Sequence, residues 1–188
     1  AYIKRPSEVC NRVMEDTLLI WKCKQGSRQA LRQIYEKYHI YLLKLAIVLT
    51  GRPTTADDIV HDVFVQFARS IPRLSLAGSL KSYLSTSTLN RVRNLRRDQL
   101  RRGERGLEDA AALPANAPRP EHWAIMGERL ERLSSAMAQL PYEQREVITL
   151  RVQSGMTFRA IAQSQNTSVS TVQGRYRYGI NKLRSLVD

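Results

Sequence analysis

The chain has 188 residues, of which 43% are hydrophobic and 25% are charged, a balance that excludes a largely disordered protein. Thirty Lys and Arg face 17 Asp and Glu, which gives a formal net charge of +13. This excess favours a polyanionic partner, with nucleic acid ahead of an acidic membrane surface or an acidic protein. The length allows one domain or two small ones.

Neither membrane insertion nor a metal site is indicated. No run approaches the roughly 18 apolar residues of a membrane span, and the N-terminal residues lack the order of a signal peptide. We therefore expect a cytoplasmic protein. Cys10 and Cys23 are the only cysteines, and they form no CxxC motif. We expect both to be reduced thiols, with no metal and no cofactor bound.

The first half of the chain has apolar residues at helical spacing and no convincing strand pattern. Glycine and proline interrupt the helical pattern near residues 51–54 and again near 72–78. The helices predicted from these breaks are 15–25, 27–50, 55–70 and 79–102. We predict that residues 1–14 form an N-terminal extension.

A linker divides the chain. The segment GERGLEDAAALPANAPRPE carries three prolines and little that could build a core, so we assign residues 103–122 to a flexible linker. As a coil it would span roughly 25 Å, or about 60 Å pulled straight, which lets two halves bind DNA a helical turn or more apart. Helices are predicted after it at 123–139, 143–154, 157–164 and 168–186. The expected fold is all-α, with two small helical domains.

The last predicted helices form a helix-turn-helix. A short helix starts after Thr157, a tight turn follows at Asn166 and Thr167, and Ser168 is placed to cap the next helix. In such a motif the second helix lies in the DNA major groove. Its apolar seam consists of Val169, Val172, Tyr176, Ile180, Leu183 and Val187.

The other side of this last helix suits DNA. Between Val147 and Arg184 there are six Lys or Arg and no acid. The alternative is a solvated basic helix in a three-helix bundle. We expect Thr171, Gln173 and Gly174 near base edges, and Arg175, Arg177 and Lys182 on phosphates. Gly174 and Gly179 would allow close approach, at about 1 kcal/mol each in helix propensity.

A second basic helix, predicted at 79–102, ends in a row of arginines. These are Arg91, Arg93, Arg96, Arg97, Arg101 and Arg102, opposed by Asp98 alone. Tyr83 and a hydroxyl-rich face precede them, and Asn90 and Asn94 lie among them. Aromatic and small polar groups beside arginines suit single-stranded or melted DNA. The alternative is that Tyr83 belongs to the core and that the arginines form a solvated helix end.

The helix predicted at 55–70 has an acidic outer face opposite a buried apolar stripe. The stripe is Ile59, Val60, Val63, Phe64 and Phe67, and the outer face carries Asp57, Asp58, His61 and Asp62. Thr55 followed by Asp58 resembles a capping box, and the helix dipole favours acids in a first turn. Helix capping and a protein partner both remain open as explanations of this face.

Together these segments resemble a known family. The chain from about Asp16 to Leu186 resembles a bacterial RNA polymerase sigma factor of the extracytoplasmic-function group, which has two DNA-engaging domains joined by a linker. ADDIVHDVFVQF looks like the segment that docks on the clamp coiled coil of the polymerase largest subunit. SLKSYLSTSTLNRVRNLRR resembles the promoter-melting helix. The segment from LPYEQREV to INKLR is similar to the family's C-terminal helix-turn-helix.

The resemblance implies roles for individual residues. Asp58, His61 and Asp62, beside Asp57, would contact core polymerase. Asn90, Arg91, Asn94 and Arg97, with Tyr83 and Arg101 on the same helix, would contact the proximal, melted promoter element. Ser170, Thr171, Gln173, Arg175 and Arg177, with Lys182, would face the distal element. The sequence departs from the family where Tyr83 replaces Trp and where Gln165-Asn166 replaces Leu-Gly.

The function implied is that of a transcription initiation factor without catalytic activity, which directs core RNA polymerase to promoters and assists melting. Residues 15–102 would be sigma domain 2 and 123–188 sigma domain 4. The implied partners are core polymerase, promoter DNA and an anti-sigma factor. The alternative is a free-standing helix-turn-helix regulator with an N-terminal sensing or dimerisation domain. An enzyme is disfavoured, because no Gly-rich phosphate loop and no carboxylate cluster with metal spacing occurs.

Overall fold

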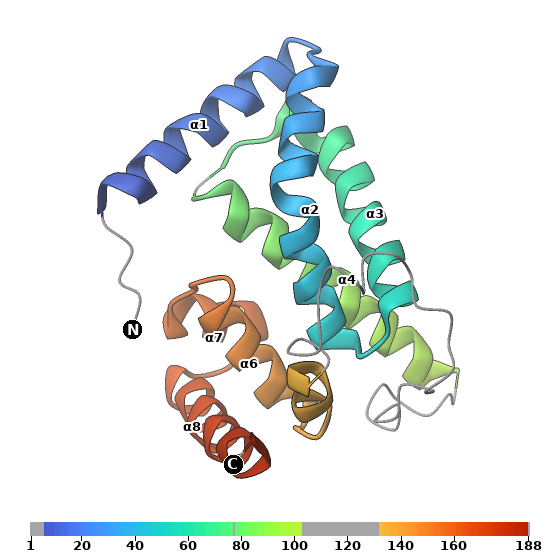
Figure 1. The fold of residues 1–188 in the computed structure, drawn as a ribbon, viewed down its shortest axis with the longest axis vertical. Coiled ribbons are helices and arrows are strands. Elements are labelled where there is room, and N and C mark those ends of the chain that lie inside the picture. The colour runs from blue at the N-terminus through green and yellow to red at the C-terminus, as the bar shows by residue number, and fades with distance from the viewer. Residues whose placement is uncertain (1–5, 77, 103–131, 188) are drawn as a thin grey trace.

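The computed structural model describes the backbone of residues 6–76, 78–102 and 132–187, with side chains described from Met14 to Leu186 within these ranges. All regular secondary structure in them is helical, as predicted. The N-terminal module, residues 6–102, contains α1 (Pro6–Lys24), α2 (Arg28–Thr50), α3 (Pro53–Ser70), the 3-10 turn η1 (Ile71–Arg73) and α4 (Leu80–Arg101). The C-terminal module, residues 132–187, has a helix over 132–138, then α6 (Tyr142–Val152), α7 (Phe158–Gln165) and α8 (Val169–Val187) (Figure 1).

Two helix starts differ from the prediction. α1 begins at Pro6, within the predicted N-terminal extension. α3 begins at Pro53, where the fixed φ of proline and its missing N–H are tolerated at the first helical position. Its N-cap is Arg52, which makes no side-chain capping bond, so the capping box expected at Thr55 and Asp58 is wrong. Residues 103–131, with most of the linker and the start of the helix predicted at 123–139, lie outside the described residues.

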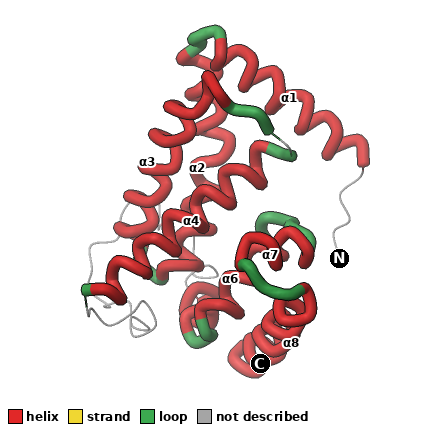
Figure 2. Tube along the Cα trace, turned by 180° about the vertical axis from the view of Figure 1, so that it is seen from behind, coloured by secondary structure: helices red, strands yellow, loops and turns green. Residues whose placement is uncertain are grey.

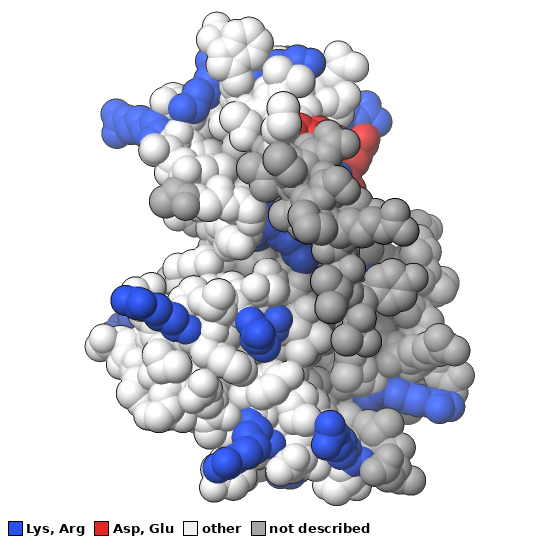
Figure 3. Space-filling view, turned by 90° about the vertical axis from the view of Figure 1, so that its left-hand side faces the viewer, with Lys and Arg blue, Asp and Glu red and all other residues white. Residues whose placement is uncertain are grey.

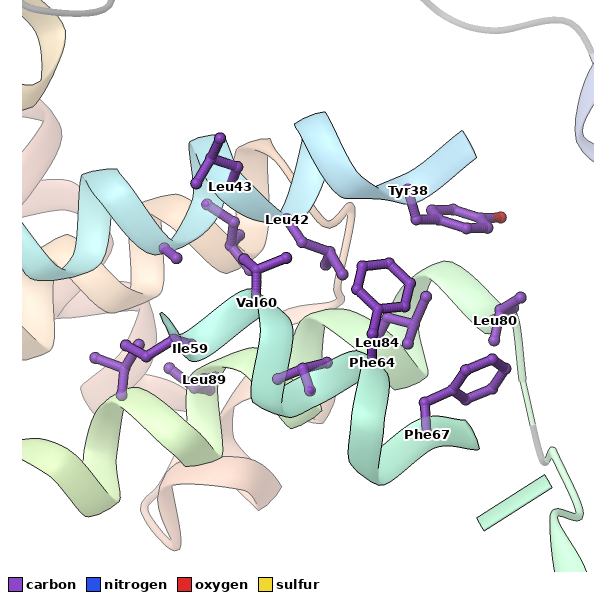
Figure 4. Packing of buried hydrophobic residues seen from close by; sticks show 14 of the residues in the cluster. Tyr38, Leu42, Leu43, Ile59, Val60, Phe64, Phe67, Leu80, Leu84 and Leu89 are labelled. Carbon is purple, nitrogen blue, oxygen red and sulfur yellow. The ribbon is translucent and has the colours of Figure 1, made fainter. Parts of the chain in front are cut away.

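The core of the N-terminal module lies between α2, α3 and α4. Figure 4 shows Leu42 of α2, Phe64 of α3 and Leu84 of α4 converging on it. The predicted stripe of α3 is buried throughout. α1 is tied to α2 by a buried carboxylate, because Asp16 Oδ2 accepts a hydrogen bond of 2.6 Å from the Tyr38 hydroxyl.

The two modules pack against each other, and their buried apolar side chains belong in part to one cluster. Val48 of α2 lies in a smaller cluster with Leu140 and Ile148 of the C-terminal module. The end of α2 thus packs on α6, and both views of the chain place α6 beside α2 and α4 (Figures 1 and 2). The sequence predicted two domains and a tether but gave no sign of this contact.

Candidate nucleic-acid interface

The helix-turn-helix is built from three local signals. Thr157 caps α7, with its Oγ1 accepting a hydrogen bond of 3.1 Å from the Ala160 N–H. α7 ends at Asn166, whose φ of 49° and ψ of 49° are left-handed. Asparagine tolerates that conformation better than most residues, which explains how it can stand where the family has glycine. Ser168 Oγ then accepts from the Thr171 N–H at 3.1 Å, and the predicted cap of α8 is confirmed.

α8 is seated on α6 and α7 by part of the predicted seam. Val172 is fully buried, and Tyr176 meets Phe158 edge-on with 5.4 Å between ring centroids. Gly179 is also buried, against α6. The inward placing of Val169 was wrong, since its side chain is 40% exposed at the start of the helix.

The outer flank of α8 is open to solvent. The exposed members of the predicted distal site are Ser170, Thr171, Gln173, Arg177 and Lys182. Arg175 is half-buried and donates a hydrogen bond of 2.8 Å from Nη1 to Gln165 Oε1. Figure 3 shows the side of the molecule where the charged side chains drawn over the C-terminal module are Lys and Arg, with the acidic ones in the upper part. Such a surface meets phosphate without repulsion.

α4 presents a second exposed row. Asn90, Asn94, Arg97 and Arg101 are exposed at spacings of four, three and four residues, which places them on one side of the helix, and Arg91 is exposed beside them. Tyr83 is half-buried, with its ring 6.1 Å from that of Phe67 and its hydroxyl 3.2 Å from Ser70 Oγ. This packing agrees with the core alternative for Tyr83.

Two of the arginines expected at the exposed end of α4 are instead turned toward the C-terminal module. Arg93 pairs with Glu146, and the guanidinium carbon of Arg96 lies 4.3 Å from the centroid of the Tyr142 ring. Arg96 Nη1 also lies 3.5 Å from a carboxylate oxygen of Glu143. The free charge density predicted for this helix is therefore lower than the sequence indicates, because these two side chains serve the contact between modules.

Helix capping does not explain the acidic face of α3. Because the helix begins at Pro53, Asp57 and Asp58 lie beyond the first turn, where the helix dipole no longer accounts for them. Asp58 and His61 are exposed, whereas Asp57 and Asp62 are half-buried. Asp62 pairs with Arg91 of α4 at 2.5 Å, so the predicted polymerase face and the predicted DNA face touch.

The described residues hold no group of three or more His, Cys, Asp or Glu placed to bind a metal ion. No helix among them is long and apolar enough to cross a membrane. What the arrangement offers is two basic helix faces and one acidic face, each suited to binding. Comparison with known proteins shows which family carries these faces. Residues 34–102 match the family model for sigma-70 region 2, and residues 130–183 match that for sigma-70 region 4.

The chain belongs to the sigma-70 family. It is 27% identical to the RNA polymerase sigma factor CnrH of Cupriavidus metallidurans over 180 residues, 92% of this chain and 94% of that relative. It is also 27% identical to the sigma factor EcfG of Rhodopseudomonas palustris over 146 residues, 78% of each chain. The sigma factor SigL of Mycobacterium tuberculosis is 27% identical over 156 residues, 82% of this chain and 86% of that one. These relatives place the sigma factor in the extracytoplasmic-function group.

Solved structures agree. CnrH in complex with the cytosolic domain of CnrY superimposes with a TM-score of 0.64 at 25% identity, covering 93% of this chain and 97% of that chain. The sigma factor RpoE bound to the anti-sigma factor NepR from Bartonella quintana shares the fold, with a TM-score of 0.62 at 22% identity, over 83% and 97% of the two chains. The protein is thus a sigma factor, which directs RNA polymerase to promoters and catalyses no reaction itself. The alternative of a free-standing regulator is set aside.

Proposed function

We propose that three surfaces of this sigma factor divide promoter recognition between them. The acidic face of α3 binds core polymerase, the exposed row of α4 holds the melted proximal element, and the flank of α8 reads the distal element. Residues 15–102 then act as sigma domain 2, residues 123–188 as sigma domain 4, and residues 103–122 as the linker between them. Because its polymerase partner acts there, the protein works in the cytoplasm.

The observation that carries this proposal is the opposite charge of the exposed faces of α8 and α3. The α8 flank has exposed Thr171, Gln173 and Arg177 with no acid on the helix, which suits phosphate and base edges. Asp58 and His61 stand exposed on α3, away from the helix end that would explain them as caps. An exposed acidic face suits a positively charged surface of another protein.

Polymerase binding is tested by charge reversal. Asp58→Lys in the full chain should weaken its association with core polymerase at least tenfold, measured by fluorescence anisotropy of the labelled sigma factor. Glu36→Lys is the matched control, since Glu36 is an exposed acid on α2 that pairs with Arg32. Equal loss in both variants, or in neither, would contradict the assignment of this face.

Promoter contacts are tested in transcription assays with core polymerase and a pool of genomic DNA. Arg177→Ala should reduce start-site selection by weakening duplex binding, whereas Asn90→Ala with Arg97→Ala should impair promoter opening seen by permanganate footprinting. Arg32→Ala, an exposed arginine on α2, is the control for lost charge. The proposal fails if the two DNA variants behave like that control.

An anti-sigma factor is the third partner that we propose. CnrH is described in complex with CnrY, and RpoE from Bartonella quintana in complex with the anti-sigma factor NepR. The overall similarity of this chain to CnrH supports a comparable inhibitor here. A pull-down from the native host with the full chain as bait, followed by competition between the captured protein and core polymerase, tests it. Captured proteins that leave polymerase binding unchanged would argue against an inhibitor.

A further inference from the structure

The contact between the modules is centred on one buried carboxylate. Glu146 of α6 has only 2% of its side chain exposed. Both of its oxygens accept hydrogen bonds from the Arg93 guanidinium of α4, with Nε lying 3.1 Å from Oε2. Arg93 Nη1 also donates to the Ser164 carbonyl oxygen near the end of α7 at 2.7 Å. One arginine of the N-terminal module thus clamps two helices of the helix-turn-helix module.

The same carboxylate reaches the DNA-reading helix. Gln165 Nε2 donates to Glu146 Oε1 at 2.7 Å, and Gln165 Oε1 accepts from Arg175 of α8 at 2.8 Å. A continuous chain of hydrogen bonds therefore runs from Arg93 through Glu146 and Gln165 to Arg175. We call these four residues the Glu146 latch. The latch engages Arg93 and Arg175, two arginines that the sequence analysis assigned to basic, DNA-facing surfaces.

Further contacts support the closed arrangement on both sides of the latch. Lys81 Nζ of α4 donates to the Gln153 carbonyl oxygen at 2.7 Å, and the Tyr41 hydroxyl of α2 donates to Ser154 Oγ at 3.0 Å. Burial raises the pKa of the Tyr41 phenol, which keeps this donor protonated. Arg145 Nη1 lies 3.3 Å from the carbonyl oxygen of Leu49 at the end of α2. The closed form is therefore a specific docking and not a loose approach.

Arg93 is also well placed to bind DNA once it is released. It lies four residues before Arg97 and three after Asn90, so on the helix surface it neighbours these two members of the exposed row. In the closed form its charge is neutralised by Glu146, and only 25% of its side chain is exposed. Opening the modules removes the carboxylate and leaves a guanidinium beside a surface that already favours phosphate.

We propose that the Glu146 latch holds the free sigma factor closed, and that Arg93 changes partner from Glu146 to promoter DNA when the modules separate. This inference rests on the proposed function of the α4 row. The carboxylate of Glu146 and the phosphates compete for one guanidinium, so that DNA binding and module closure oppose each other. Only open molecules can use Arg93 on DNA. The apparent affinity of the free protein for DNA is therefore the affinity of the open form multiplied by the fraction of molecules that are open.

The test uses the full chain and two variants that break the latch from opposite sides. Glu146→Gln leaves Arg93 charged, whereas Arg93→Gln removes the charge that is released. Small-angle X-ray scattering should show a larger radius of gyration for both variants than for the wild type. Glu36→Gln, which changes an exposed ion pair of α2 outside the latch, is the control and should stay compact.

DNA binding separates the two variants. Affinity for a 30-base-pair duplex of random sequence is measured by anisotropy over a range of salt concentrations. Glu146→Gln should bind about tenfold more tightly than the wild type with an unchanged log-log salt slope, because Arg93 contacts a phosphate in both bound states. Arg93→Gln should open equally, but its log-log salt slope should be shallower than that of the wild type by about 0.9, because one phosphate contact is missing.

Two results would overturn the inference. Compact scattering profiles for both variants would show that the Glu146 latch does not hold the modules together. Equal log-log salt slopes for the two variants would show that Arg93 does not contact DNA. Circular dichroism checks that each variant is folded. If Glu146→Gln loses helical signal, the scattering profiles and salt slopes of Arg93→Gln and of the charge-conserving Arg93→Lys test the inference in its place. Failure of the wild type to direct polymerase start sites would instead refute the proposed function, while scattering without polymerase still tests the latch.

Discussion

Two glycines of α8 should respond to the same substitution with opposite signs. A Cβ built on Gly174 meets no other atom within 4 Å, whereas one on Gly179 would lie 2.7 Å from Ile148 Cδ1 and 3.2 Å from Gln144 Cβ. Neither glycine has a positive φ, so both accept alanine in the backbone. Only the space around them differs.

The magnitudes follow from that difference. Gly174→Ala should raise the free energy of unfolding by about 0.5 to 1 kcal/mol, since alanine is the better helix former. Gly179→Ala gains the same propensity but overpacks the contact between α8 and α6, at a cost of about 1 to 3 kcal/mol. Because Gln144 Cβ is fixed to the backbone and Ile148 is buried, we expect a net loss of about 1 kcal/mol.

Urea unfolding of the full chain, followed by circular dichroism at 222 nm, measures both changes. A double-mutant cycle sharpens the test, because Ile148→Val removes the Cδ1 atom that causes the shortest contact. Alone, Ile148→Val should cost about 1 kcal/mol, and beside Gly179→Ala it should cost clearly less. Stabilisation by Gly179→Ala equal to that by Gly174→Ala would refute the close approach of α8 to α6.

Two further predictions concern buried polar groups. Arg145→Met should lower the free energy of unfolding by about 3 kcal/mol in the same assay, because the 1% exposed guanidinium donates to Ala138 O at 2.9 Å and to Leu140 O at 3.2 Å. Burial raises the pKa of the Cys23 thiol, so less thiolate is present at pH 8. In Cys10→Ser protein, Cys23 should react with Ellman's reagent about tenfold more slowly than in urea, and an equal rate in both would contradict its burial.

The local parts of the fold could be predicted because their signals are local. Apolar spacing gave the helices, and the caps at Thr157 and Ser168 gave the turn motif, since each rests on residues within four positions of one another. The start of α3 differs from the prediction because a proline such as Pro53 usually interrupts a helix, although it is favoured at the first helical position.

The contact between the modules could not be predicted, because its partners are far apart in the chain. Arg93 and Glu146 are 53 residues apart, and nothing in either segment indicates that they meet. The acid-free window that favoured DNA binding begins at Val147, so the one acid that neutralises Arg93 stands immediately outside it. Counting charges along a segment shows how many cations a helix carries but not which of them are already paired.

The amide of Gln165 has only one workable orientation. Its neighbour on one side is a carboxylate, which can only accept hydrogen bonds, and on the other a guanidinium, which can only donate them. Rotating the amide by half a turn would place its oxygen against the Glu146 carboxylate and its NH2 group against the Arg175 guanidinium, so that neither hydrogen bond could form. Glutamate here would face Glu146 with a second negative charge, and lysine would face Arg175 with a second positive one. A bifunctional neutral side chain at this site therefore gives the network a direction.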